Sequence, residues 1–188
     1  IAPILQRKST ETGLPYPRDK HRFIVDLMQR FEVCYTPESE PETIIAPALL
    51  PPAPAVFDFN EMTALRFQFN YEFLPPSVMA RFIVKMCHDI KHDCRWKNAV
   101  IVEHSAWRTT ALITTDEATR KIRIAVNGAQ KRDYLSVIRK TFADIHAGFE
   151  RLDVDERVCF PDHPENTVSL DDLLWLEQNG ERTYTNIE

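Results

Sequence analysis

The stretch LRFQFNYEF, residues 65–73, constrains the fold more than any other part of the sequence. Apolar and polar residues alternate along its length, which is the period-two pattern of a strand with one buried face. The apolar face carries Leu65, Phe67, Phe69, Tyr71 and Phe73. The pattern therefore predicts a strand in a sheet that packs a core against one of its faces.

The residues after this strand predict one α+β unit. The sequence PPS ends the strand, and Ser77 is expected to cap a helix over residues 78–90. Three β-rich segments follow, RWKNAVIVEH, WRTTALITTD and KIRIAVNG, and a hairpin-length turn separates the last two. A long helix is predicted over RDYLSVIRKTFADIHAGF, a short strand over VDERVCFPD and a last helix over LDDLLWLEQ. Ser169 and Asp172 form a capping box for that last helix, and Gly180 ends it.

The predicted order is β-α-β-β-β-α-β-α and contains no alternating βαβ units. We therefore predict an α+β fold, an antiparallel sheet with flanking helices.

The N-terminal part of the sequence predicts a smaller unit that precedes this sheet. Asp19 is expected to cap a helix through KHRFIVDLMQRF, and EVCYT and TIIAPALL are expected to pair as a β-hairpin. A helix followed by a hairpin is typical of the closing half of a winged-helix module, and equally of any small α+β piece. The prolines of PALLPPAPAVFD favour an extended, semi-rigid linker. We predict three parts: residues 1–52, a linker over residues 53–60, and the α+β unit over residues 61–188.

The stretch KMCHDIKHDC, residues 85–94, raises the question of a metal site or a reactive thiol. It holds Cys87, His88, His92 and Cys94. On a continuous helix the two cysteines flank the apolar stripe and the two histidines point to the opposite face. Zinc needs ligands that converge on one point, which side chains on opposite sides of a helix cannot do. We therefore predict no metal, no cofactor and no catalytic residue, and we keep a metal or thiol enzyme centred on this stretch as a weaker alternative.

Composition narrows the function classes further. The chain of 188 residues has a net charge of −5, which speaks against a broad nucleic-acid footprint. The four glycines lie too far apart for a Walker A loop or a dinucleotide-binding loop. The four scattered cysteines favour free thiols and a cytoplasmic location, no signal peptide is visible, and the prolines interrupt every run long enough for a membrane span. We interpret the chain as part of a larger protein.

Four blocks resemble the COR region of Roco proteins: HRFIVDLMQRFEVCY, IIAPALLPP, LRFQFNYEFLPPSVMARFIVKM and WKNAVIVE. The resemblance runs from about Asp19 to the C-terminus, and Y-x-FLPPSVM-x-RFIV-x-M is its most specific part. In this family a Ras-like GTPase domain, Roc, is followed by COR. The first COR subdomain contains a winged-helix-like fold, and the second is α+β. The resemblance implies that residues 1–52 are the C-terminal part of the first subdomain and that residues 61–188 are the second.

The resemblance also implies a non-enzymatic role as a homodimerisation module that is coupled to the adjacent Roc domain. GTP and Mg²⁺ would then be ligands of Roc, with no nucleic acid and no membrane span for this chain. The alternative is a winged-helix nucleic-acid-binding protein with an appended α+β domain. Exposed aromatic residues often anchor protein interfaces, although at least half of those on the 65–73 strand are expected in the core. The predicted partner interface comprises Phe69, Tyr71, Phe73, Leu74 and Trp107.

Overall fold

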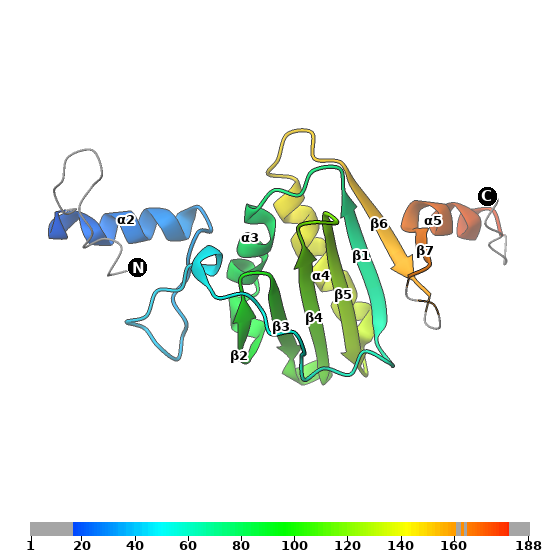
Figure 1. The fold of residues 1–188 in the computed structure, drawn as a ribbon, viewed down its shortest axis with the longest axis horizontal. Coiled ribbons are helices and arrows are strands. Elements are labelled where there is room, and N and C mark those ends of the chain that lie inside the picture. The colour runs from blue at the N-terminus through cyan, green and yellow to red at the C-terminus, as the bar shows by residue number, and fades with distance from the viewer. Residues whose placement is uncertain (1–16, 161–162, 164, 181–188) are drawn as a thin grey trace.

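The structure is a computed structural model that describes residues 17–160, 163 and 165–180 (Figure 1). Its centre is a seven-stranded antiparallel sheet with the strand order β2-β3-β4-β5-β1-β6-β7. The strands are β1 (Leu65–Tyr71), β2 (Ile90–Trp96), β3 (Ala99–His104), β4 (Thr109–Asp116), β5 (Lys121–Gly128), β6 (Val154–Cys159) and β7 (Thr167–Ser169). The α-helices are α2 (Arg18–Arg30), α3 (Ser77–Lys85), α4 (Lys131–His146) and α5 (Leu170–Gln178). The short 3₁₀ helices are η1 (Pro47–Leu49), η2 (Cys87–Asp89) and η3 (Ser105–Trp107). The predicted α+β class with an antiparallel sheet is confirmed.

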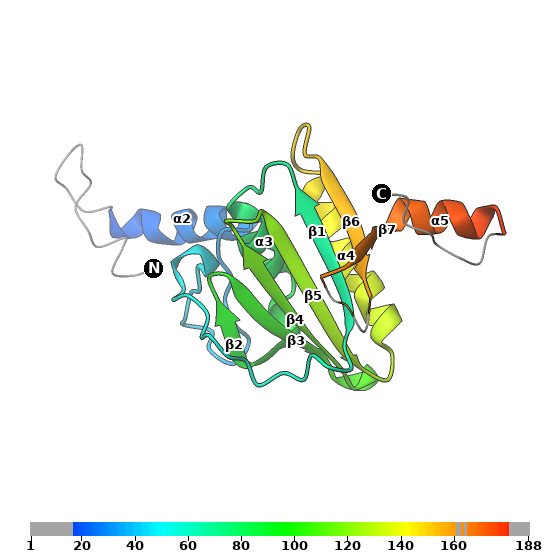
Figure 2. The same cartoon turned by 45° about the vertical axis from the view of Figure 1, so that its right-hand side comes forward.

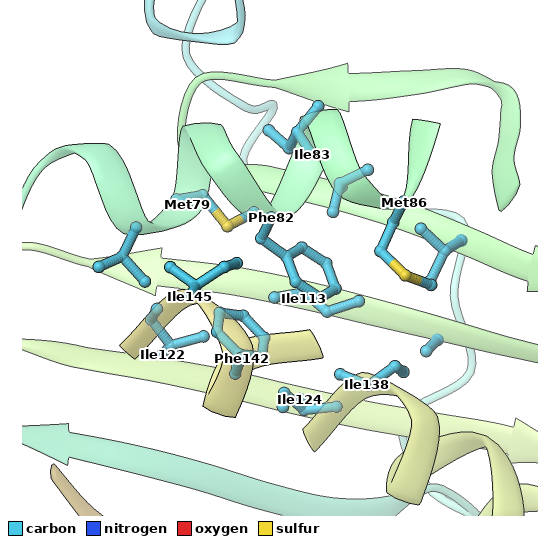
Figure 3. Packing of buried hydrophobic residues seen from close by; sticks show 14 of the residues in the cluster. Met79, Phe82, Ile83, Met86, Ile113, Ile122, Ile124, Ile138, Phe142 and Ile145 are labelled. Atoms are coloured by element: carbon cyan, nitrogen blue, oxygen red, sulfur yellow. The ribbon is translucent and has the colours of Figure 1, made fainter. Parts of the chain in front are cut away.

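Helices α3 and α4 cover one face of the sheet and bury the core there (Figures 1 and 2). The alternation of β1 places Phe67 and Phe69 on this face, and both side chains are buried. Phe82 of α3 stacks on Phe142 of α4 with ring centroids 4.3 Å apart (Figure 3). The core therefore lies where the period-two strand and the two amphipathic helices meet, as the sequence pattern predicts.

The predicted helix over residues 78–90 is too long. Helix α3 ends at Lys85, η2 follows, and Ile90 already begins β2. The segment RWKNAVIVEH, predicted as one strand, contains the end of β2, a turn and β3. The short edge strand β7 was not predicted either, so the observed order is β-α-β-β-β-β-α-β-β-α.

The N-terminal part differs from its prediction at two places. The N-cap of α2 is Pro17, and Asp19 lies inside the first turn, where its charge complements the helix dipole. The expected β-hairpin is reduced to one bridge, in which Tyr35 and Ile45 exchange N–H···O bonds of 3.0 and 2.9 Å. Pro47 then begins η1 and ends the extended conformation that a hairpin strand would need.

The proline-rich segment lies against the sheet. The backbone N–H of Lys97 donates to the carbonyl oxygen of Pro51 at 2.9 Å, and the N–H of Ala53 donates to Asn98 Oδ1 at 2.8 Å. Residues 51–62 run across one end of the face that α3 and α4 leave uncovered (Figure 1). Tyr35 and Ile45 also belong to the main hydrophobic core. The N-terminal part and the α+β unit therefore share one core over the described residues.

The last helix follows its prediction more closely. Ser169 is the N-cap of α5, although its side chain makes no capping hydrogen bond. Gly180 has φ +71, the left-handed conformation that glycine commonly supplies just after a helix. Helix α5 thus begins after Ser169 and ends before Gly180 as predicted, but the Ser169 side chain does not make the hydrogen bond of the predicted capping box with Asp172.

Candidate interaction surface

The candidate surface lies where the chain leaves the sheet at the end of β1 and turns into α3. Strand β1 ends at Tyr71, and Phe73 two residues later is 66% exposed. Two prolines follow, and because proline has no N–H to donate, they end the sheet hydrogen bonding and direct the chain into α3. Pro75 is buried and Pro76 is the N-cap of α3. Phe73 is therefore held at the surface by a rigid turn and not by a flexible loop.

Two grooves meet at Phe149, which follows α4. One, of about 570 Å³, lies between the C-terminal end of α2, the start of α3 and Phe149. The other, of about 250 Å³, lies between Phe73 and the loop of residues 149–153. We define the β1-end surface by five of the apolar residues that line these grooves: Phe31, Val33, Phe73, Pro76 and Phe149. Phe31 is 66% exposed and Val33 is 43% exposed.

An ion-pair network joins Glu32, two residues after the end of α2, to α3 beside this surface. Arg81 Nε donates to Glu32 Oε2 at 2.7 Å, and Lys85 Nζ lies 2.6 Å from Glu32 Oε1. Burial raises the pKa of Glu32, but the hydrogen bonds from Lys85 and Arg81 outweigh it, so the pKa lies below its ordinary value. The Arg81 guanidinium also lies 5.7 Å from the centroid of the Phe149 ring, within cation–π range. The network fixes the walls of the larger groove.

A partly buried pair of polar residues, Tyr71 and His146, lies on the sheet side of the same region. The Tyr71 hydroxyl and His146 Nε2 are 2.9 Å apart, and the His146 ring contacts those of Phe69 and Phe142. Burial lowers the pKa of His146 to about 4. Burial and then the charge of Glu156 raise the pKa of Tyr71. At neutral pH both groups are uncharged, so the hydrogen bond joins two neutral groups in an aromatic surrounding.

Stability is expected to fall as the pH is lowered from 6.5 to about 4. His146 has a depressed pKa in the folded chain, so the unfolded chain binds its proton first and gains stability in this window. The effect of this residue is absent above the window and levels off below it. The melting temperature of the wild-type chain, measured from pH 8 to pH 4, should decrease more than that of His146→Gln, which accepts a hydrogen bond but does not titrate. Parallel curves for the two proteins would contradict the assignment.

The structure separates the five residues of the predicted partner interface. Phe69 is 0% exposed and Tyr71 is 5% exposed, so both lie in the core. Leu74 is partly buried and packs on the core, which leaves Phe73 as the exposed member at this end of the sheet. Trp107 of η3 stacks on His104, the last residue of β3. It lies two positions before Thr109, which pairs with Gly128, the last residue of β5. Since β5 runs antiparallel to β1 and its last residues pair with the start of β1, Trp107 lies at the opposite end of the sheet from Phe73.

The cysteine and histidine residues of the stretch 85–94 lie on different elements. Cys87 and His88 belong to η2, and His92 and Cys94 to β2, so the single-helix placement was wrong for His92 and Cys94. His92 has φ 42, a left-handed conformation that interrupts the strand. His88 Nδ1 lies 3.3 Å from a carboxylate oxygen of Glu38. In the part of the chain that the structure describes, histidine, cysteine and carboxylate side chains form no cluster of three or more that could hold a metal ion.

The sequence predicts no membrane span, and the described helices can be compared with that prediction. Over residues 17–160, 163 and 165–180, none of them has the length and the apolar character needed to cross a bilayer. All four cysteines are free thiols.

The sequence of this chain is similar to a protein family and to a known protein. A family model described as "C-terminal of Roc, COR-B domain" matches residues 62–187, which is more than half of the chain. The chain is also 27% identical over 135 residues to "Probable serine/threonine-protein kinase pats1" of Dictyostelium discoideum. That alignment covers 64% of this chain and 4% of the Dictyostelium protein. The chain therefore spans a small part of the curated relative that it matches.

Proposed function

Since the chain belongs to the C-terminal of Roc, COR-B domain family, we propose that it is a non-catalytic module of a Roco protein that forms homodimers and couples to an adjacent Roc GTPase domain. GTP and Mg²⁺ are then ligands of Roc and not of this chain. The four free thiols support a cytoplasmic location. The kinase named in the Dictyostelium relative is not proposed for this chain, because the alignment covers 4% of that protein.

The β1-end surface supports the coupling to Roc. Phe73 is exposed two residues after a strand whose aromatic residues are buried, and it lies inside the family match. Exposed aromatic residues beside a rigid groove are typical anchors of protein interfaces. The Glu32–Arg81–Lys85 network ties this surface to α3, which packs on the same core as Tyr71. A partner bound at Phe73 would thus contact a surface that is packed directly on the core of the module.

Binding to a separately purified Roc domain of a Roco protein tests this coupling. Isothermal titration calorimetry should show saturable binding to the wild-type chain, and Phe73→Ser should weaken it by about tenfold or more, since buried aromatic anchors commonly contribute more than about 1 kcal/mol. Met62→Ser is the matched control, because Met62 is 90% exposed and lies outside the β1-end surface. Equal affinities for the two variants would remove Phe73 from the interface, and no binding by any of the proteins would count against the coupling itself.

Homodimerisation is tested by a mass measurement in solution. Light scattering should give twice the chain mass of 21.9 kDa at micromolar concentration. A monomer at every concentration studied would contradict this half of the proposal while leaving the Roc-binding experiment informative.

A further inference from the structure

The larger groove of the β1-end surface carries an excess of positive charge. Its charged lining consists of Arg30, Glu32 and Arg81. Both Arg81 and Lys85 contact Glu32, so one carboxylate is shared by two cations. Arg30 is exposed, and in the part of the chain that the structure describes it takes part in no ion pair. The larger groove therefore combines apolar walls with cations that lack enough carboxylates to balance them.

The smaller groove carries the opposite charge. Three carboxylates line it, those of Glu72, Glu150 and Asp153, together with one cation, Arg151. All four residues are exposed, and the ion pairs among the described residues include none of them. The smaller groove therefore favours a cationic group of a partner, whereas the larger groove favours an anionic group.

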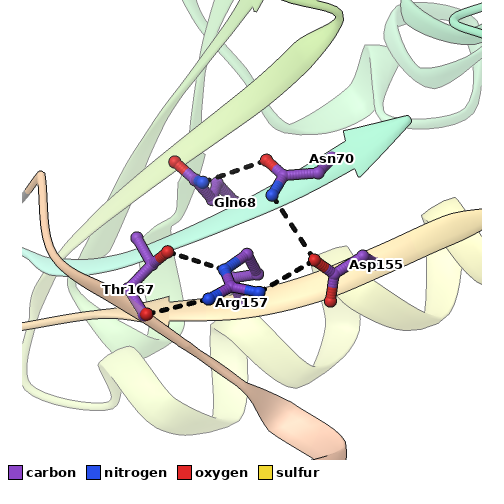
Figure 4. A network of polar contacts seen from close by, with 5 residues as sticks. All are labelled: Gln68, Asn70, Asp155, Arg157 and Thr167. Atoms are coloured by element: carbon purple, nitrogen blue, oxygen red, sulfur yellow. Dashed lines mark hydrogen bonds and ion pairs between the residues drawn. The ribbon is translucent and has the colours of Figure 1, made fainter. Parts of the chain in front are cut away.

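A polar network holds the loop that carries two of these carboxylates. Asn70 of β1 pairs with Asp155 of β6, just after this loop, and its Nδ2 donates to Asp155 Oδ2 at 3.5 Å. Arg157 Nη1 donates to the same oxygen at 3.0 Å (Figure 4). The loop between α4 and β6 and the turn between β1 and α3 lie side by side at one end of the sheet (Figures 1 and 2). The sheet thus holds the negative charges next to Phe73.

Phe149 lies between the two sets of charges. It lines both grooves and is partly buried against the core. Arg81 of the larger groove lies 5.7 Å from the centroid of the Phe149 ring, and Glu150 of the smaller groove follows Phe149 directly in the sequence. The β1-end surface is therefore an apolar patch with positive charge on one side and negative charge on the other.

We propose that the segment of Roc that binds the β1-end surface carries charges of both signs in a fixed order. Its acidic side chains face Arg30 and Arg81 at the larger groove, and its basic side chains face the three carboxylates of the smaller groove. An apolar side chain between them packs on Phe149. The inference rests on the coupling to Roc proposed above and adds the direction in which the Roc segment lies. A segment bound the other way round would place like charges together at both grooves, which disfavours that orientation.

Two opposite charge reversals test this contact. Arg30→Glu changes the larger groove and Glu150→Lys changes the smaller one. In calorimetric titrations with a purified Roc domain, each variant should bind at least about threefold more weakly than the wild type, and the variant that carries both changes about tenfold more weakly. The two changes alter the net charge in opposite directions. A partner attracted only by the overall charge would therefore bind one variant more weakly and the other more tightly.

Control variants make the same changes at exposed positions outside both grooves. Arg132→Glu on α4 and Glu177→Lys on α5 should each bind Roc within about twofold of the wild type. Melting curves of all variants show that each of them is folded.

The possible outcomes separate this inference from the proposed function. If the wild type binds Roc and the two charge variants bind equally well, or change in opposite directions, the two-signed contact is wrong and the coupling to Roc stands. Weakening by only one of the two variants also overturns the two-signed contact. No binding of Roc by the wild type overturns the coupling and this inference together.

Discussion

Replacement of Phe142 by alanine is expected to lower the free energy of unfolding by about 3–5 kcal/mol, as large-to-small changes of buried aromatic residues do. Phe142 is 0% exposed and stacks on Phe82 at 4.3 Å, so it joins α4 to α3 (Figure 3). It also lies 5.0 Å from the ring of Phe69, so it joins both helices to β1. Truncation leaves a cavity where these three elements meet.

Thermal unfolding followed by circular dichroism measures this effect. For a chain of this size, about 2–4 °C are lost per kcal/mol, so Phe142→Ala should lower the melting temperature by about 6–20 °C. The control is Val137→Ala on the same helix, since Val137 is 38% exposed and should cost much less. Equal shifts for the two variants would show that the Phe82–Phe142 stack does not hold the layers together.

The parts of the fold that could be predicted are those in which one local pattern decides burial. Strand β1 has polar and apolar residues in strict alternation, and its neighbours β5 and β6 pair with it on both sides. The amphipathic stripe predicted for α4 comprises Leu135, Ile138, Phe142, Ile145 and Phe149. Its three middle members are buried, and Leu135 and Phe149 are partly buried against the core. In such segments the residues that the sequence period places on one face are the residues that the structure buries.

Strand β2 could not be predicted because it lies at the edge of the sheet and its sequence gives no alternation. His92 and Asp93 are exposed and adopt left-handed φ values of 42 and 61, which break the pairing between Ile90 and Arg95. Such irregularities protect edge strands from pairing with other chains. The helical pattern of α3 runs into this segment in the sequence, so the boundary at Lys85 is set by the sheet and not by a local stop signal.

The candidate site depends on contacts between distant residues, and this explains what the sequence missed. Phe69 and Phe73 occupy equivalent positions in the alternation, yet one is 0% and the other 66% exposed. The difference arises because the strand leaves the sheet after Tyr71. Glu32 and Arg81, which form a wall of the larger groove, are 49 positions apart. No local pattern carries information about such a pair.

Gly128→Ala should be strongly destabilising, because this position tolerates no side chain. Gly128 ends β5 with φ +132, and a Cβ there would lie 2.4 Å from the Arg108 carbonyl oxygen and 2.5 Å from Thr109 Cα. Both obstacles are backbone atoms, so β4 and β5 must separate. The backbone conformation alone costs about 1–3 kcal/mol for a residue other than glycine, and the loss with the clash is expected to be about 3 kcal/mol or more.

Separation of β4 from β5 would also disturb the start of α4, because Thr109 contacts it. Its Oγ1 donates to the Trp107 carbonyl at 2.9 Å and accepts from the N–H of Gln130, the N-cap of α4, at 3.2 Å. Gly148→Ala is the matched control, since its Cβ would meet the Arg81 guanidinium at 3.1 Å and the Ile145 carbonyl oxygen at 3.3 Å, both farther away than the backbone atoms at Gly128. Urea unfolding should give a much lower midpoint for Gly128→Ala than for Gly148→Ala. Similar midpoints would mean that β4 and β5 can part at this end without loosening the start of α4.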